Sequence, residues 1–233
     1  MSFRRFGPGR IVPLLAAAAF AGCAGGPDPE AAGLSHMYVH YTQVGEIVEG
    51  VVDGDVPATR SGARWLANHR SQQFPAGAEG PLEMMRAEAR IILAQDKVTD
   101  IAMSVGRMGG ACARCHVALN GGPRINVEMA PPATSDPDRT MVRHVWAVDR
   151  LWEGIIGPSD AAWASGAAVL AAPGLDLGPP GNRPAQADDL AKRIPELGQM
   201  AKAARDPRER AEVYGHLLQT CAQCHEALGM RMR

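Results

Sequence analysis

The sequence predicts an all-α protein built from two similar halves. Aromatic residues make up only 5% of the 233 residues, and the alternation of apolar and polar residues that marks β-strands is absent. Alanine, leucine, arginine and glutamate, which favour helices, are abundant instead. The same order of helical segments occurs twice, so we expect two tandem four-helix bundles.

An internal repeat relates the two halves. Met37 and His40 recur 104 residues later as Met141 and His144, whereas a Cys-x-x-Cys-His motif recurs after 109 residues. The second half therefore contains five more residues than the first between these two markers. We expect the insertion at 174–184, where glycine and proline are frequent.

The expected helices follow from apolar periodicity and from breaks at glycine and proline. They cover 34–53, 57–73, 81–94 and 97–119 in the first half and 138–156, 159–171, 185–203 and 206–228 in the second. Asp206-Pro207 is a suitable start for the last helix, because proline is favoured at the first helical position. One bundle then spans 34–120 and the other 138–233, and residues 121–137, with four prolines, link them.

The two Cys-x-x-Cys-His motifs predict covalent haem. This spacing is the attachment signature of c-type haem, in which each cysteine sulfur joins a vinyl group and the histidine binds the iron. A shared four-thiolate zinc site would leave both histidines unexplained, a disulfide would close a strained loop, and a thioredoxin-like pair lacks strand-rich surroundings. The sequence therefore predicts two haem c groups. The attaching cysteines are Cys112, Cys115, Cys221 and Cys224, and the proximal iron ligands are His116 and His225.

Four helices with Cys-x-x-Cys-His in the fourth resemble the class II c-type cytochromes, the cytochrome c-prime family. The resemblance depends mainly on the position of the motif near the C-terminal end of each half. It implies one haem near the end of the fourth helix of each bundle. Short third helices and the tandem duplication depart from the single-bundle pattern of the family.

Two further histidines are expected as distal iron ligands. In an up-down-up-down bundle the start of the first helix lies beside the end of the fourth, and His40 and His144 lie there on apolar stripes. Of the seven histidines, only these two and the two motif histidines recur at matching positions. The alternative is that both are ordinary helix histidines retained from the duplication. The sequence does not indicate whether each would bind the iron of its own half or of the other.

Methionine is the rival distal ligand. Met37 and Met141 lie one turn before the two histidines on the same stripes, and methionine would raise the reduction potential. As core residues they would instead fill gaps around the porphyrin. A third possibility is an open sixth position, as in typical cytochromes c-prime, which bind small gases.

The N-terminal residues 1–22 are predicted to be a signal peptide. Three arginines precede an apolar run of about 11 residues, too short for the roughly 20 residues of a spanning helix. Residues 20–23, Phe-Ala-Gly-Cys, resemble the lipobox of bacterial lipoproteins, although leucine is usual where Phe20 stands. This implies lipid attachment to Cys23. The alternative is plain secretion with Cys23 as a free thiol.

These features place the protein in the bacterial cell envelope, facing the periplasm. Residues 23–33, rich in proline and glycine, are expected to form a flexible tether. Covalent haem attachment of this kind takes place outside the cytoplasm, in agreement with an export signal. No aspartate follows Cys23 directly, which under lipoprotein sorting rules favours the outer membrane.

Composition narrows the function further. Residues 1–22 carry three arginines and no acidic residue, so their removal would change the formal net charge from −1 to −4. An acidic chain is a poor partner for nucleic acid. We expect a carrier of single electrons between protein redox partners rather than an enzyme. The alternatives are a dihaem peroxidase, a gas-binding protein and the haem subunit of a larger membrane oxidoreductase.

Overall fold

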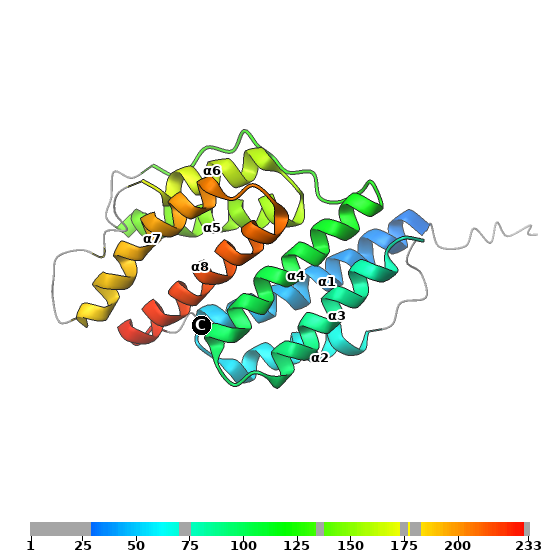
Figure 1. The fold of residues 1–233 in the computed structure, drawn as a ribbon, viewed down its shortest axis with the longest axis horizontal. Helices are drawn as coiled ribbons and strands as arrows, with labels where there is room; N and C mark the ends of the chain where they lie inside the picture. Colours follow the sequence, from blue (N-terminus) through cyan, green and yellow to red (C-terminus); the bar gives the residue numbers. More distant parts are fainter. Residues whose placement is uncertain (1–28, 70–75, 134–137, 173–176, 178–182, 231–233) are drawn as a thin grey trace, which may run out of the picture.

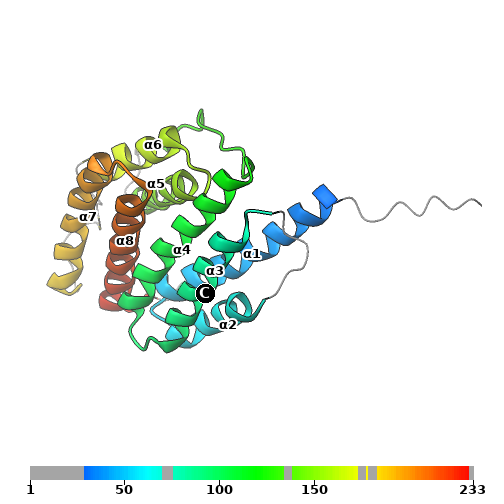
Figure 2. The same cartoon turned by 45° about the vertical axis from the view of Figure 1, so that its right-hand side comes forward.

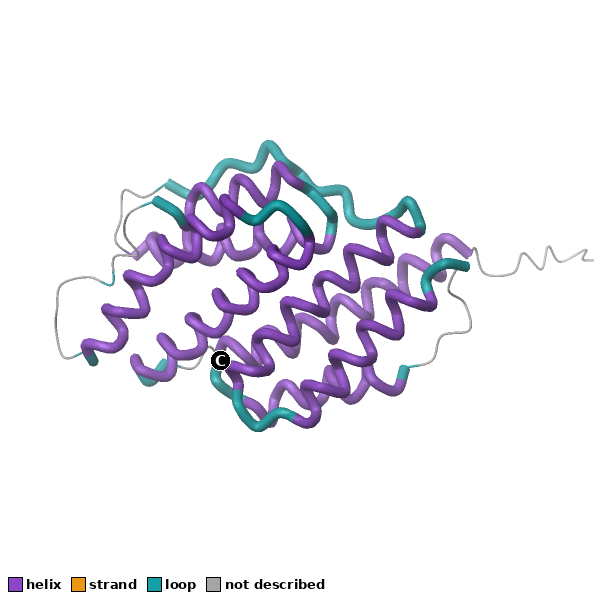
Figure 3. The backbone as a smooth tube through the Cα atoms, in the orientation of Figure 1, coloured by secondary structure: helices purple, strands orange, loops and turns teal. Residues whose placement is uncertain are grey.

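The computed structural model describes residues 29–69, 76–133, 138–172, 177 and 183–230. All regular structure in these residues is α-helical, which confirms the all-α prediction (Figure 3). The helices are α1 (Pro29–Val52), α2 (Val56–Asn68), α3 (Glu79–Ala94), α4 (Val98–Ala118), α5 (Asp138–Ile156), α6 (Asp160–Leu170), α7 (Ala185–Ala203) and α8 (Pro207–Leu228). The predicted signal peptide and Cys23 lie outside the described residues. None of the described helices has the length and apolar composition needed to cross a membrane.

The helix boundaries reproduce both spacings of the repeat. Helix α6 begins 104 residues after α2, whereas α8 begins 109 residues after α4. The ends of α3 and α7 are also 109 residues apart. The five additional residues therefore lie between α6 and α7, as expected from the composition of 174–184, a segment that is largely outside the described residues.

Two boundaries differ from the sequence prediction. Helix α1 begins at Pro29, so residues 29–33 of the expected flexible tether are helical. Proline suits the first turn of a helix, and the glutamate and alanines that follow favour its continuation. Helix α2 ends at Asn68 rather than at residue 73, because His69 has an extended backbone with ψ of 119°. Its carbonyl oxygen accepts two hydrogen bonds, of 2.9 and 3.1 Å, from the Arg86 guanidinium, which replace a helical bond.

Polar side chains fix the starts of several helices. Asp55 caps α2 by accepting a hydrogen bond from the Ala58 N–H, and Ser159, 104 residues later, caps α6 in the same way. Asp206 caps α8 in a reciprocal pair with Glu209, which confirms the predicted helix start. Equivalent caps in the two halves show that the repeat extends to local structure.

Helices that follow one another in sequence pack together within each half. Contacts join α1 to α2, α2 to α3 and α3 to α4, and the same order holds from α5 to α8. Helices α4 and α8 then pack against each other at the centre of the molecule (Figures 1 and 2). The end helices of the two groups thus form the interface between the halves.

Glycines allow α4 and α8 to approach closely. A β-carbon on Gly106 would lie 2.1 Å from the carbonyl oxygen of Ala211, and one on Gly215 would lie 3.3 Å from that of Ala102. These contacts exchange when the halves are exchanged, because Gly215 and Ala211 follow Gly106 and Ala102 by 109 residues. Positions rise on one helix as they fall on the other, so the two helices run antiparallel. The two halves are related by approximate two-fold symmetry at this crossing.

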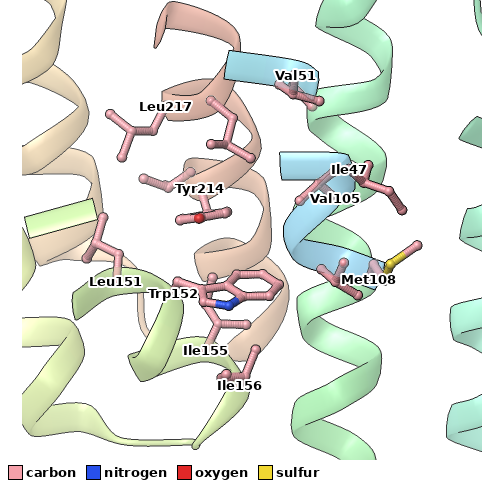
Figure 4. Packing of buried hydrophobic residues seen from close by; sticks show 14 of the residues in the cluster. Ile47, Val51, Val105, Met108, Leu151, Trp152, Ile155, Ile156, Tyr214 and Leu217 are labelled. Atoms are coloured by element: carbon pink, nitrogen blue, oxygen red, sulfur yellow. The ribbon is translucent and has the colours of Figure 1, made fainter. Parts of the chain in front are cut away.

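A continuous hydrophobic core joins the halves. Its buried residues come from all eight helices named above, and Figure 4 shows side chains of α1, α4, α5 and α8 meeting in one interior. Trp152 stacks on Tyr214 with ring centroids 5.2 Å apart. Tyr214 is only 2% exposed. The interface between the halves is therefore packed as a protein interior.

Candidate haem-binding sites

Both Cys-x-x-Cys-His motifs lie at the C-terminal end of a helix. Helix α4 carries Cys112 to His116 and ends at Ala118, whereas α8 carries Cys221 to His225 and ends at Leu228. Cysteines three residues apart on a helix share one face. All four motif cysteines are free thiols. Among the described residues they do not form one shared cluster of metal ligands, so each pair belongs to its own site.

A cavity of about 520 Å³ adjoins the motif of the first half. This volume lies within the range of small-molecule and cofactor sites, about 300–1,000 Å³. Helix α1 contributes Met37 and His40 to its wall, opposite the motif residues of α4. The motif and distal candidates of this half therefore face one space. Other wall residues come from the linker and from α5, namely Gly122, Arg124, Ile125, Trp152, Glu153 and Ile156.

Hydrogen bonds orient the two motif histidines. Nδ1 of His116 lies 2.6 Å from the carbonyl oxygen of Ile156, and Nδ1 of His225 lies 3.0 Å from that of Val52. A carbonyl only accepts, so each Nδ1 carries the proton and donates it. Each Nε2 is then left with the lone pair that a metal requires.

These hydrogen bonds cross between the halves. Helix α4 carries His116, whereas its partner Ile156 ends α5; helix α8 carries His225, whereas its partner Val52 ends α1. Val52 and Ile156 are 104 residues apart, so the two bonds exchange with the halves. Each half thus orients the motif histidine of the other.

The histidine of the first helix of the second half lies beside the motif of that half. Nε2 of His144 is 4.0 Å from Sγ of Cys221. Burial lowers the pKa of His144 to about 4, and the neighbouring His225 lowers it further in the same direction. The neutral imidazole, which is the form that binds a metal, therefore prevails at neutral pH.

His40 has a similar environment in the first half. Its side chain is 4% exposed and lines the cavity together with Cys112 and Cys115. Burial lowers the pKa of His40 to about 3, helped by nearby His36, His69 and Arg86. Both first-helix histidines thus lie at the motif of their own half, which answers the question that the sequence left open.

The methionine candidates lie close to these histidines. Met37 lines the same cavity as His40. Met141 is half-buried on α5, one turn before His144. The structure therefore keeps methionine near the first motif and brings histidine into contact with the second.

The residues of each site fit a covalently bound haem. Two thiols on one helix face match the two vinyl positions, and the adjacent imidazole is held in the tautomer that leaves Nε2 for iron. In the first half these groups border an apolar cavity rather than a filled core.

Sequence reasoning missed the residues that complete the first site. Residues 121–125 were expected only to link the halves, yet they form part of the cavity wall. A β-carbon on Gly122 would lie 2.9 Å from Cγ of His116. Trp152 and the Ile156 carbonyl come from the other half. The Gly-Gly-Pro sequence at 121–123 is the only local indication of a close approach in this segment.

Replacing Gly122 with alanine should perturb the first site alone. Gly122 has φ of 123°, which an alanine adopts only with strain of about 1–3 kcal/mol, and its methyl group would push the His116 ring away from Ile156. We expect the absorption spectrum of one haem to change and that of the other to stay. Gly121→Ala is the matched control, because its β-carbon would lie 3.8 Å from the nearest atom. Equal spectra for the two variants would contradict this role of Gly122.

No family model, curated protein or solved structure matches this chain.

Proposed function

We propose that this protein is a dihaem c-type cytochrome that carries single electrons between protein redox partners at the periplasmic side of a bacterial membrane. The observation that best supports this is the arrangement around each motif. An oriented motif histidine and a buried histidine of the first helix lie at the same cysteine pair in both halves. One such arrangement could be chance, but two related by exchange of the halves indicate a function kept in both.

The finer fold belongs to this proposal. We interpret α1 to α4 and α5 to α8 as two tandem bundles of the cytochrome c-prime kind, each with one haem near the end of its fourth helix. The order of helix contacts within each group supports this interpretation. The extensive packing of α4 on α8 is an addition to the single-bundle pattern, and it would bring the two haem sites into one rigid core.

Each side chain has a distinct part in the proposed mechanism. Haem iron supplies the one-electron chemistry. His116 and His225 hold the iron from one side, and the carbonyls of Ile156 and Val52 keep both rings in place. His40 and His144 provide neutral imidazole on the other side. Ligands fixed in a packed core change position little on reduction, so the protein favours fast electron exchange. Apolar walls keep water from the first site.

The haem count tests the proposal directly. Mass analysis of the mature exported protein should show two covalent haems, and its absorption and paramagnetic-resonance spectra should show low-spin iron only. Replacing both Cys112 and Cys115 with serine should remove one haem, and replacing Cys221 and Cys224 should remove the other. Bare thiols, zinc or disulfides at these positions in the mature chain would overturn the proposal.

The same preparation distinguishes a carrier from its rivals. A carrier with two six-coordinate irons should show no peroxide turnover and only weak binding of carbon monoxide when reduced. Tight binding of carbon monoxide or nitric oxide would favour a gas-binding protein. Stable co-purification with other membrane proteins would favour a haem subunit of a larger oxidoreductase.

The lipid anchor is tested separately. Cys23→Ser should leave both haems in place but release the protein from membranes into the soluble periplasmic fraction, because the acyl chains that hold it are lost. The unmodified protein should float with membrane vesicles. A Cys23→Ser protein that remained with the membranes would show that Cys23 is not the anchor.

A further inference from the structure

A second group of histidines lies next to the first haem site. His36 and His40 lie on successive turns of α1, and His69 follows the end of α2. One ring nitrogen of each lies within 4.8 Å of one ring nitrogen of the other two. The ring centroids are 4.5, 4.7 and 5.5 Å apart. Three imidazoles gathered in this way form a ligand set for a divalent transition metal, as in three-histidine zinc sites.

Surrounding contacts hold the three rings in place. Positions four residues apart share one face of a helix, so His36 and His40 point to the same side of α1. The His69 ring stacks on Trp65 with centroids 4.0 Å apart and planes 11° apart. The two Arg86 hydrogen bonds fix the backbone of His69 at the end of α2.

The cluster is not a by-product of the internal repeat. Only His40 has a histidine counterpart in the second half, whereas Thr140 and Pro173 occupy the positions that match His36 and His69. Two histidines specific to the first half therefore meet the one that recurs. This asymmetry indicates a function that the second half does not share.

His40 belongs to two sites at once. It lines the haem cavity with Cys112 and Cys115, and it is also a member of the histidine cluster. A neutral imidazole has one nitrogen with a lone pair, because the other carries the proton. His40 can therefore bind only one metal at a time.

We propose that His36, His40 and His69 bind a divalent transition-metal ion, and that this ion takes His40 away from the haem iron of the first half. The exchange of His40 rests on the proposed dihaem function, but the three-histidine site does not. Loading the site would open the sixth position of one iron and leave the other, ligated through His144, unchanged. The protein would then contain one sealed haem and one haem that responds to metal.

Zinc titration of the full-length, haem-loaded protein tests this. Zn²⁺ is a suitable probe because it has no redox chemistry of its own. Calorimetry should show one Zn²⁺ bound per chain, while the absorption spectrum shows one of the two haems changing from low to high spin. A chelator should restore the original spectrum. The His36→Gln/His69→Gln double variant should keep both low-spin haems and lose the zinc-binding event.

The control is His216→Gln. His216 lies on α8 with its Nδ1 3.2 Å from Gln219 Oε1, away from the cluster. This variant should bind zinc as the unmodified protein does. Its behaviour separates loss of the site from loss of any one histidine.

Two outcomes would overturn the inference. Undiminished zinc binding by the double variant would show that the three histidines are not the site. Zinc binding that left both haems low-spin would show that His40 is not exchanged. Failure of the proposed dihaem function is a different result, because a high-spin haem before any zinc was added would remove His40 as iron ligand while calorimetry still tested the cluster.

Discussion

Replacement of His144 with alanine is expected to convert one of the two haems, and only one, from low spin to high spin. Nε2 of His144 lies 4.0 Å from Sγ of Cys221, the first attachment cysteine of the second half. Alanine removes the imidazole and leaves an iron with His225 as its only protein ligand. Absorption and paramagnetic-resonance spectra of the oxidised protein measure the change. The reduced variant should also gain a site for carbon monoxide.

Matched variants locate the effect. His40→Ala should convert the other haem, and the double variant should convert both. His216→Ala, which removes a histidine that lies at neither motif, should leave both low-spin. Unchanged spectra in His40→Ala and His144→Ala would move the distal assignment to Met37 and Met141, or to no side chain at all.

Replacement of Gly106 with alanine is expected to destabilise the whole protein. The added β-carbon would lie 2.1 Å from the carbonyl oxygen of Ala211, which belongs to helix α8 and cannot turn aside as a flexible side chain can. Helices α4 and α8 would have to separate and open the shared core. Such overpacking costs about 1–3 kcal/mol or more, and the better helix propensity of alanine offsets about 1 kcal/mol of this.

Gly110→Ala is the matched control in the same helix. Its β-carbon would lie 3.9 Å from Cβ of Ala211, an ordinary contact, so the gain in helix propensity of about 1 kcal/mol should prevail. Denaturant unfolding followed by circular dichroism gives the free energy of unfolding of both variants. Gly106→Ala at least as stable as Gly110→Ala would refute the close approach of the two helices.

The position of this crossing also matters for the sites. The hydrogen bonds of His116 and His225 reach across the halves, so a shift of α4 against α8 should loosen both. We therefore expect Gly106→Ala to alter the spectra of both haems, in contrast to Gly122→Ala, which should alter one.

Local chemistry explains why so much of the fold could be predicted. Helix starts depend on residues within one turn, as Asp206 and Glu209 show at α8. Helix α2 ends early for a distant reason, because the guanidinium that accepts the role of its next turn belongs to Arg86, 17 residues beyond His69. Such a contact leaves no periodic pattern in the sequence.

The sequence by itself determined the helical class, the duplication, the cysteine pairs and their histidines, since each of these depends on spacing along one segment. It also indicated that His40 and His144 would lie at the motifs, because the repeat singled them out. Only the tertiary structure decided that each motif histidine donates to a carbonyl of the other half, and that His36 and His69 gather around His40. A main-chain carbonyl has no residue type, and a contact between distant helices depends on how they pack, so neither can be found from residue spacing.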